Sequence, residues 1–150
     1  MLLVAIIVTS PSPEPQATES KPAHPAKSHA SRELAKLAPA DEYFGRQRLS
    51  ILGMRNMLHD LQRDAQNGSK DDASVVNSAR AVEDALHDWQ ARYPLDPWLP
   101  RYIYQLDGLY HRVDSDEAHE RGVSVHSWLV SAYPHSTYAR HARQNDFDRS

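Results

Sequence analysis

The stretch of this 150-residue chain that is richest in reactive side chains runs from residue 111 to residue 120. It holds two imidazoles and four carboxylates: His111, Asp114, Asp116, Glu117, His119 and Glu120. Such groups bind Zn²⁺ and also transfer protons in catalysis. However, His111 and His119 straddle an expected helix break, and no HExxH-type spacing fixes two ligands on one helix face. The stretch is better explained as a solvated loop with a capping box, in which Asp114 begins a helix and Glu117 follows three residues later.

A ligand-binding role for residues 111–126 remains as an alternative. His119 and His126 are seven residues apart and would share a helix face, but two ligands alone do not close a metal site. The sequence therefore predicts no metal and no cofactor. It keeps a small-ligand or metal-binding helical domain as the second hypothesis.

Catalytic motifs are missing from the sequence. It contains no Gly-x-Ser-x-Gly, Walker or dinucleotide-binding motif, and its five glycines form no phosphate-cradling loop. Carboxylate pairs such as Asp60 and Asp64 fall on the polar faces of expected helices, where nothing would desolvate them and separate their pKa values. We predict that the protein is not an enzyme.

Four residues near position 100 are the best candidates for a binding surface. Trp98, Tyr102 and Tyr104 lie off the apolar stripe of their helix, and Arg101 stands beside Trp98, where it could pair with a carboxylate. Trp, Tyr and Arg are the residues most enriched at interaction hot spots. The alternative is that these aromatic rings pack in the core. Core packing is the expectation for the remaining large rings of the repeated motif described below: Trp89, Tyr93, Trp128 and Tyr133.

The elements that would position these residues are all helices, because no segment alternates with a period of two. Apolar residues recur at spacings of three and four, and Gly, Pro and capping residues separate the periodic segments. Five helices are expected, at about 41–66, 71–93, 96–113, 114–133 and 136–144.

One pattern occurs twice, about forty residues apart. Trp89 to Arg101 reads WQARYPLDPWLPR, and Trp128 to Arg140 reads WLVSAYPHSTYAR. In each copy a helix ends at Tyr-Pro and the next helix begins behind a capping residue, Asp96 in the first copy and Ser136 in the second. Recurrence at a period of 20–50 residues is typical of stacked helix pairs.

This pattern resembles the tetratricopeptide-type repeats of bacterial envelope scaffold proteins, such as the outer-membrane-assembly lipoproteins and the periplasmic partners of the Tol–Pal system. The resemblance covers about residues 72–144 and rests mainly on Tyr133-Pro134-His135-Ser136 followed by Tyr138-Ala139-Arg140-His141-Ala142. It implies an all-α stack of antiparallel, TPR-like helical hairpins. Such stacks bind extended or helical peptides on a concave face.

The first forty residues differ from the rest. Leu2–Val8 (LLVAIIV) is a short apolar run, and residues 9–40 hold six of the ten prolines and no aromatic residue. We interpret residues 1–8 as the remnant of an export signal, or alternatively as an apolar N-terminus without a role. Residues 9–40 are predicted to be a disordered, Pro-rich linker, and residues 41–150 an all-α domain.

Charge and cysteine content narrow the function further. Residues 41–150 hold 13 Lys/Arg and 17 Asp/Glu, a net charge of −4, which argues against binding to nucleic acid. The absence of cysteine excludes disulfides, thiol catalysis and a lipid-modified N-terminal cysteine. We expect a non-catalytic interaction module of the cell envelope, periplasmic or secreted. Its expected partner is another envelope protein or peptide, and its N-terminus would bring it close to a membrane.

Overall fold

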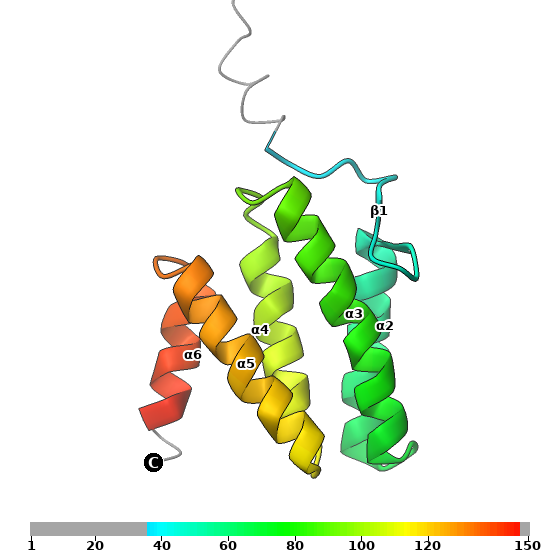
Figure 1. Cartoon of the computed structure of the whole chain (residues 1–150). Helices are drawn as coiled ribbons and strands as arrows, with labels where there is room; N and C mark the ends of the chain where they lie inside the picture. The colour runs from blue at the N-terminus through cyan, green and yellow to red at the C-terminus, as the bar shows by residue number, and fades with distance from the viewer. Residues whose placement is uncertain (1–35, 148–150) are drawn as a thin grey trace, which may run out of the picture.

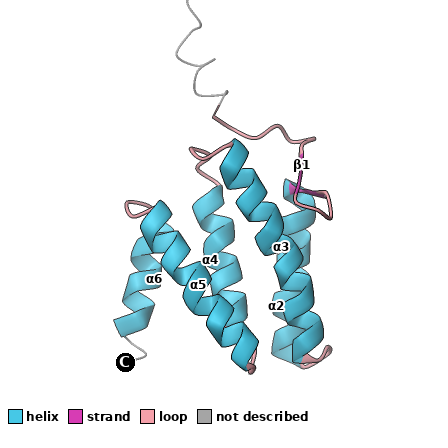
Figure 2. Cartoon of the chain, in the orientation of Figure 1, coloured by secondary structure: helices cyan, strands magenta, loops and turns pink. Residues whose placement is uncertain are grey.

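Five helices follow one another through residues 36–147, the part of the chain that this computed structural model describes (Figure 1). They are α2 (Ile51–Asn67), α3 (Asp72–Arg92), α4 (Leu99–Tyr110), α5 (Asp116–Ala132) and α6 (Thr137–Phe147). The predicted all-α class is confirmed, since the strands in this range are only β1 (Tyr43–Phe44) and β2 (Leu49–Ser50), paired antiparallel (Figure 2). The export-signal remnant at 1–8 and the linker up to residue 35 lie outside the described residues.

The helices form two layers. Figure 1 shows α3 and α5 in front, with α2, α4 and α6 behind them. Each helix reverses the direction of the one before it, so the three helices of the rear layer run the same way. The central helix α4 packs against all four others. No helix among residues 36–147 is long and apolar enough to cross a membrane.

A tight hairpin, not a helix, precedes α2. The predicted helix from residue 41 is therefore wrong over its first ten residues. Gly45 and Arg48 both have positive φ (69° and 52°), which a helix cannot contain. The turn lets Phe44 point into the core, where its ring stacks on that of Trp89 at 5.5 Å between centroids. Helix α2 then begins behind Ser50, whose Oγ accepts a hydrogen bond from the Gly53 N–H at 3.0 Å.

The two Tyr-Pro turns of the repeat have nearly the same backbone geometry. Tyr93 has φ −132° and ψ 61°, and Tyr133 has φ −129° and ψ 51°. Their N–H groups bond back to the carbonyls of Trp89 and Leu129, respectively. Leu129, not Trp128, is therefore the structural equivalent of Trp89, and both are fully buried. The predicted core role holds for Trp89, whereas Trp128 is only half-buried.

Two predicted helix starts are displaced. Helix α5 begins behind Ser115, whose Oγ accepts from the Ala118 N–H at 3.2 Å, so the predicted capping box at Asp114 is wrong. Glu117 instead pairs with Arg121 at 3.0 Å. Helix α4 begins at Leu99, three residues after Asp96, whose two side-chain oxygens accept hydrogen bonds as described below.

The fifth predicted helix starts where the sequence placed it. Ser136 Oγ accepts from the Ala139 N–H at 3.0 Å, so Ser136 caps α6 as expected. The helix continues to Phe147, beyond the predicted end at residue 144.

Candidate functional site

A groove of about 420 Å³ lies between the N-terminal ends of α2 and α4, with the segment that precedes the hairpin along one side. Because α2 and α4 run parallel and pack together, their first turns meet at one end of the molecule. Three of the four predicted binding residues line this groove: Trp98, Arg101 and Tyr102. The remaining lining residues are Leu37, Ala38, Ala40, Ile51, Leu52, Arg55 and Asp96.

Asp96 builds the groove. It is 2% exposed, and its Oδ2 accepts hydrogen bonds from the Ala38 N–H at 2.9 Å and the Trp89 Nε1–H at 3.1 Å. Its Oδ1 accepts from the Trp98 N–H at 3.0 Å. One carboxylate thus holds the segment at residue 38 against the helices and also fixes the position of the Trp98 backbone N–H. The sequence predicted Asp96 only as a helix cap, because its partner Ala38 is 58 residues away and carries no polar side chain.

Two large apolar side chains of the groove are open to solvent. Leu52, in the first turn of α2, is 55% exposed, and Trp98 is 51% exposed. Both line the same groove, so their exposed surfaces form one site. The prediction that Trp98 faces a groove agrees with this position.

Tyr102 and Tyr104 do not share that role. Tyr102 is 6% exposed, and its ring packs 5.6 Å from that of Trp89, so it belongs to the core beneath the groove. Tyr104 faces α6, where its ring lies 5.8 Å from Tyr138 and its hydroxyl accepts from Asn145 Nδ2 at 3.2 Å. Positions 102 and 104 are about 200° apart around α4, so the two side chains face different neighbours.

Two arginines flank the groove without an ion-pair partner among residues 36–147. Arg55 and Arg101 are exposed, and the guanidinium of Arg101 lies 5.8 Å from the centre of the Trp98 ring. Some arginines elsewhere are paired with carboxylates: Arg92 lies 2.7 Å from Asp88, and Arg121 lies 3.1 Å from Glu83. The groove is therefore apolar inside with a positive rim.

A second, smaller cavity of about 180 Å³ lies between α4 and its neighbours and contains the imidazoles of His111 and His126. His111 Nδ1 is 3.1 Å from Oδ1 of Asp107, and His126 Nδ1 is 3.5 Å from its Oδ2. His111 Nδ1 also lies 2.8 Å from the Asp107 carbonyl oxygen. Asp107 is 5% exposed and joins α4 to α5 through these contacts.

Two histidines of the predicted histidine-rich region, His111 and His126, thus do lie together. They face Asp107, which was not among the predicted site residues. The spacing from Asp107 to His111 is one helical turn and could have revealed the pair. His119, in contrast, is exposed on α5. Within the described part of the chain, no group of three or more His, Asp or Glu residues is placed to hold a metal ion.

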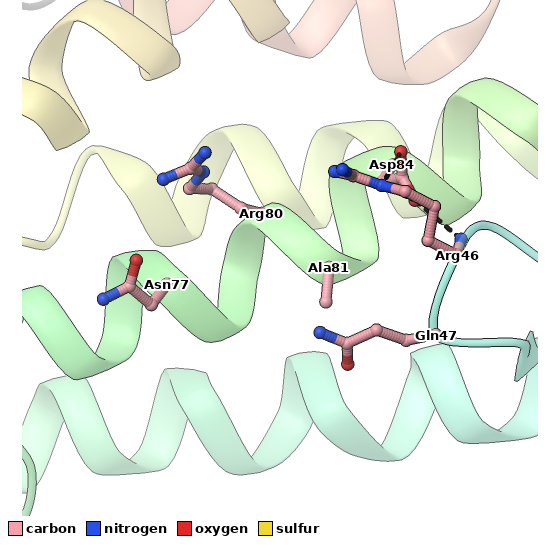
Figure 3. Close-up of a pocket in the computed structure, with 6 residues that line it drawn as sticks. All are labelled: Arg46, Gln47, Asn77, Arg80, Ala81 and Asp84. Atoms are coloured by element: carbon pink, nitrogen blue, oxygen red, sulfur yellow. Dashed lines mark hydrogen bonds and ion pairs between the residues drawn. The ribbon is translucent and has the colours of Figure 1, made fainter.

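A third hollow, of about 360 Å³, lies beside the hairpin turn (Figure 3). There, Arg46 reaches across to Asp84 on α3, with its N–H donating to Asp84 Oδ2 at 2.8 Å. Gln47 and Ala81 lie toward each other above α2 in the same view. These contacts join the hairpin to α3. The second arginine of the hollow, Arg80, lies 3.7 Å from Glu117 on α5.

Some carboxylates with shifted pKa values lie where one secondary-structure element contacts another or a connecting loop. A hydrogen bond from the Gly45 N–H, together with Arg92, lowers the pKa of Asp88. Hydrogen bonds from Lys70 and Ser69 lower the pKa of Asp64. Each of these carboxylates has structural partners that account for its shift.

The groove therefore exposes two large apolar side chains, Leu52 and Trp98, and its shape depends on Asp96. Comparison of the chain with protein-family models, with curated proteins and with solved structures finds no match.

Proposed function

We propose that this protein is a non-catalytic interaction module that docks a segment of another protein in the groove between α2 and α4. The observation that carries the proposal is the joint exposure of Leu52 and Trp98 at one groove. Large apolar side chains that gather in a concave surface are typical of protein-binding sites, and tryptophan is the residue most enriched at their hot spots.

The arrangement of helices supports this proposal. Successive antiparallel pairs in two layers, joined by equivalent Tyr-Pro turns, are what helical-repeat scaffolds are built from. In such stacks one layer commonly provides the binding face, and here the groove belongs to the rear layer of α2, α4 and α6.

We further propose that the module works in the bacterial cell envelope, periplasmic or secreted. Two sequence features support this location: the apolar run Leu2–Val8 and the Pro-rich stretch that follows it. The resemblance to tetratricopeptide-type envelope scaffolds is consistent with it.

Site-specific photocrosslinking tests the docking function. A photoreactive residue placed at Leu52 should crosslink to a defined partner, which is then identified and shown to bind the purified full chain. Val123 is the matched control, because it is similarly exposed (56%) but lies on α5 in the other layer. Equal crosslinking from both positions, or a partner that still binds after Trp98→Ala, would contradict docking in the groove.

A second candidate function is binding of a small polar ligand in the cavity at Asp107. It is favoured by the two imidazoles that face this nearly buried carboxylate. A ligand held by the native state raises the melting temperature by mass action. A melt of the full chain with and without Zn²⁺, and of Asp107→Asn as control, separates this function from docking. An unchanged midpoint would remove Zn²⁺ as the ligand.

A further inference from the structure

The charge at the groove rim points to the chemistry of the partner. Arg55 extends from the second turn of α2 and Arg101 from the first turn of α4, and neither has a carboxylate partner among the described residues. The N-terminal ends of both helices add a positive partial charge at the same place. A carboxylate held there would face two guanidinium groups, each able to donate a forked pair of hydrogen bonds.

This positive rim contrasts with the rest of the domain. Residues 41–150 carry a net charge of −4, so the positive rim of the groove stands on a domain that is acidic overall. Charge complementarity at an interface selects partners and excludes those of the same sign. A basic segment would be repelled both by the rim and by the two helix ends.

Asp96 does not cancel this positive charge. It is the only carboxylate among the residues that line the groove, and it is 2% exposed. Both of its oxygens already accept hydrogen bonds, from Ala38, Trp89 and Trp98. Its oxygens are therefore occupied by N–H donors of the protein, and among the described residues it forms no ion pair with Arg55 or Arg101.

The apolar surface and the charge lie close enough to act on one ligand. The guanidinium of Arg101 is 5.8 Å from the centre of the Trp98 ring, a cation–π distance that keeps it beside the indole. Leu52 and Arg55 are three residues apart on α2 and so lie on the same face. Each helix thus offers one large apolar side chain next to one arginine.

We propose that the groove recognises a peptide segment of another protein that carries a carboxylate next to bulky apolar side chains. The apolar side chains contact Leu52 and Trp98, and the carboxylate binds between Arg55 and Arg101. This inference rests on the proposed docking function of the groove and adds the chemical class of the ligand.

A selection from a random peptide library on the immobilised full chain tests the ligand class. Groove ligands are those whose binding is lost with Trp98→Ala, and we expect Asp or Glu beside Leu, Ile, Phe or Trp in them. Binding of labelled peptides is then measured by fluorescence anisotropy. Arg55→Gln/Arg101→Gln should weaken binding about tenfold, since two partly desolvated charge pairs are removed. The charge-matched control Arg48→Gln/Arg112→Gln should leave binding unchanged.

Changes to the peptide provide a test that does not alter the protein. Replacing the acidic residue by its amide should reproduce the tenfold loss, and added salt should weaken the wild-type complex but not the Gln variant. Amidation of the peptide C-terminus distinguishes a terminal carboxylate from a side-chain carboxylate, and either one fits the proposed chemistry.

Three results would overturn the inference, and they separate it from the proposed function. Groove ligands that are neutral or basic, or that bind the Gln variant equally well, disprove the carboxylate while docking stands. A photocrosslink from position 52 to residues 1–35 of the same chain would show that the protein's own N-terminal segment, and not another protein, occupies the groove. Selection only of peptides that ignore Trp98→Ala contradicts both proposals.

Discussion

The indole Nε1–H of Trp89 donates a hydrogen bond to Oδ2 of Asp96, 3.1 Å away, across the Tyr-Pro turn that joins α3 to α4. The same oxygen accepts from the Ala38 N–H. The core, the turn and the edge of the groove therefore meet at one atom. Since Trp89 is fully buried, its N–H has no access to water if this acceptor is removed.

Replacement of Asp96 should therefore affect both stability and the groove. Asp96→Ala leaves three N–H donors, on Ala38, Trp89 and Trp98, without their acceptor and should lower the free energy of unfolding by about 2–4 kcal/mol. Amide hydrogen exchange at Ala38 should accelerate more than exchange in the helices. Urea denaturation and exchange measure the two effects. Asp114→Ala is the control, because Asp114 is exposed and caps no helix. A loss below about 0.5 kcal/mol would contradict the role assigned to Asp96.

The two tryptophans of the repeat should differ in their contributions to stability. Trp89→Ala removes a fully buried side chain and should cost about 3–5 kcal/mol. Trp128 is half-buried, stacks on the exposed His87 at 3.9 Å and donates to Gln90 Oε1 at 2.9 Å. Its replacement by Ala should cost about 1–2 kcal/mol. Equal losses in urea denaturation would mean that both rings belong to the core, contrary to the geometry.

Two glycines provide a matched pair of substitutions. A Cβ at Gly45 would lie 2.8 Å from the Ala85 Cα, and the residue has φ +69°. Gly45→Ala should therefore destabilise the fold by more than about 1 kcal/mol. At Gly108, within α4, a Cβ meets nothing within 4 Å. Gly108→Ala should leave stability unchanged or raise it by up to about 1 kcal/mol, as expected for a helix interior. Thermal midpoints of the two variants compare these effects directly.

Stability should decrease in acid through Asp88 and Asp64. The pKa of each is lower in the folded protein than in the unfolded chain, because hydrogen bonds stabilise the ionised form. Such a group stabilises the fold above its unfolded pKa, near about 4, and this contribution is lost as pH falls through the folded value. Urea midpoints measured from neutral pH to about pH 3 should fall. The urea midpoint of Asp88→Asn should fall less over the same range. A variant with the same pH dependence as the wild type would exclude Asp88 as a cause of the acid sensitivity.

The proposed envelope location has its own test. A reporter that is active only outside the cytoplasm, fused after residue 150, should be active when the chain starts at Met1 or at an upstream in-frame start. A version in which Ile6 and Ile7 are replaced by Asp should lose the activity. A fusion that is made from each of these starts but stays in the cytoplasm, without reporter activity, would refute export.

Most of the helical architecture could be predicted from the sequence. The period of three and four in residues 71–93 fixed α3 to within one residue at each end, because apolar spacing and the proline at 94 both act locally. The hairpin was missed because Phe44, Ile51 and Leu58 have the seven-residue spacing of a helix stripe. The local structure is decided by the positive φ of Gly45 and Arg48, which the spacing of apolar residues does not predict.

The candidate site could be predicted only in part. Position on the helix correctly suggested exposure for Trp98 and Arg101, but it also suggested exposure for Tyr102, which Trp89 covers. Leu52 and Arg55 were not among the candidates, because only the packing of α2 against α4 brings them beside Trp98. The roles of Asp96 and Asp107 depend on contacts between distant segments or across helices, which residue spacing alone does not specify.

The attachment of Ala38 to Asp96 also has a mechanical consequence. The chain enters the domain along the edge of the groove, so tension applied through residue 37 acts on the Ala38–Asp96 hydrogen bond before it reaches any helix. Yielding at this one bond would remove a wall of the groove while α2 to α6 stay packed. Pulling on the N-terminal side would therefore strain this wall of the groove before the helices, and a segment docked there as proposed would lose one of its contacts.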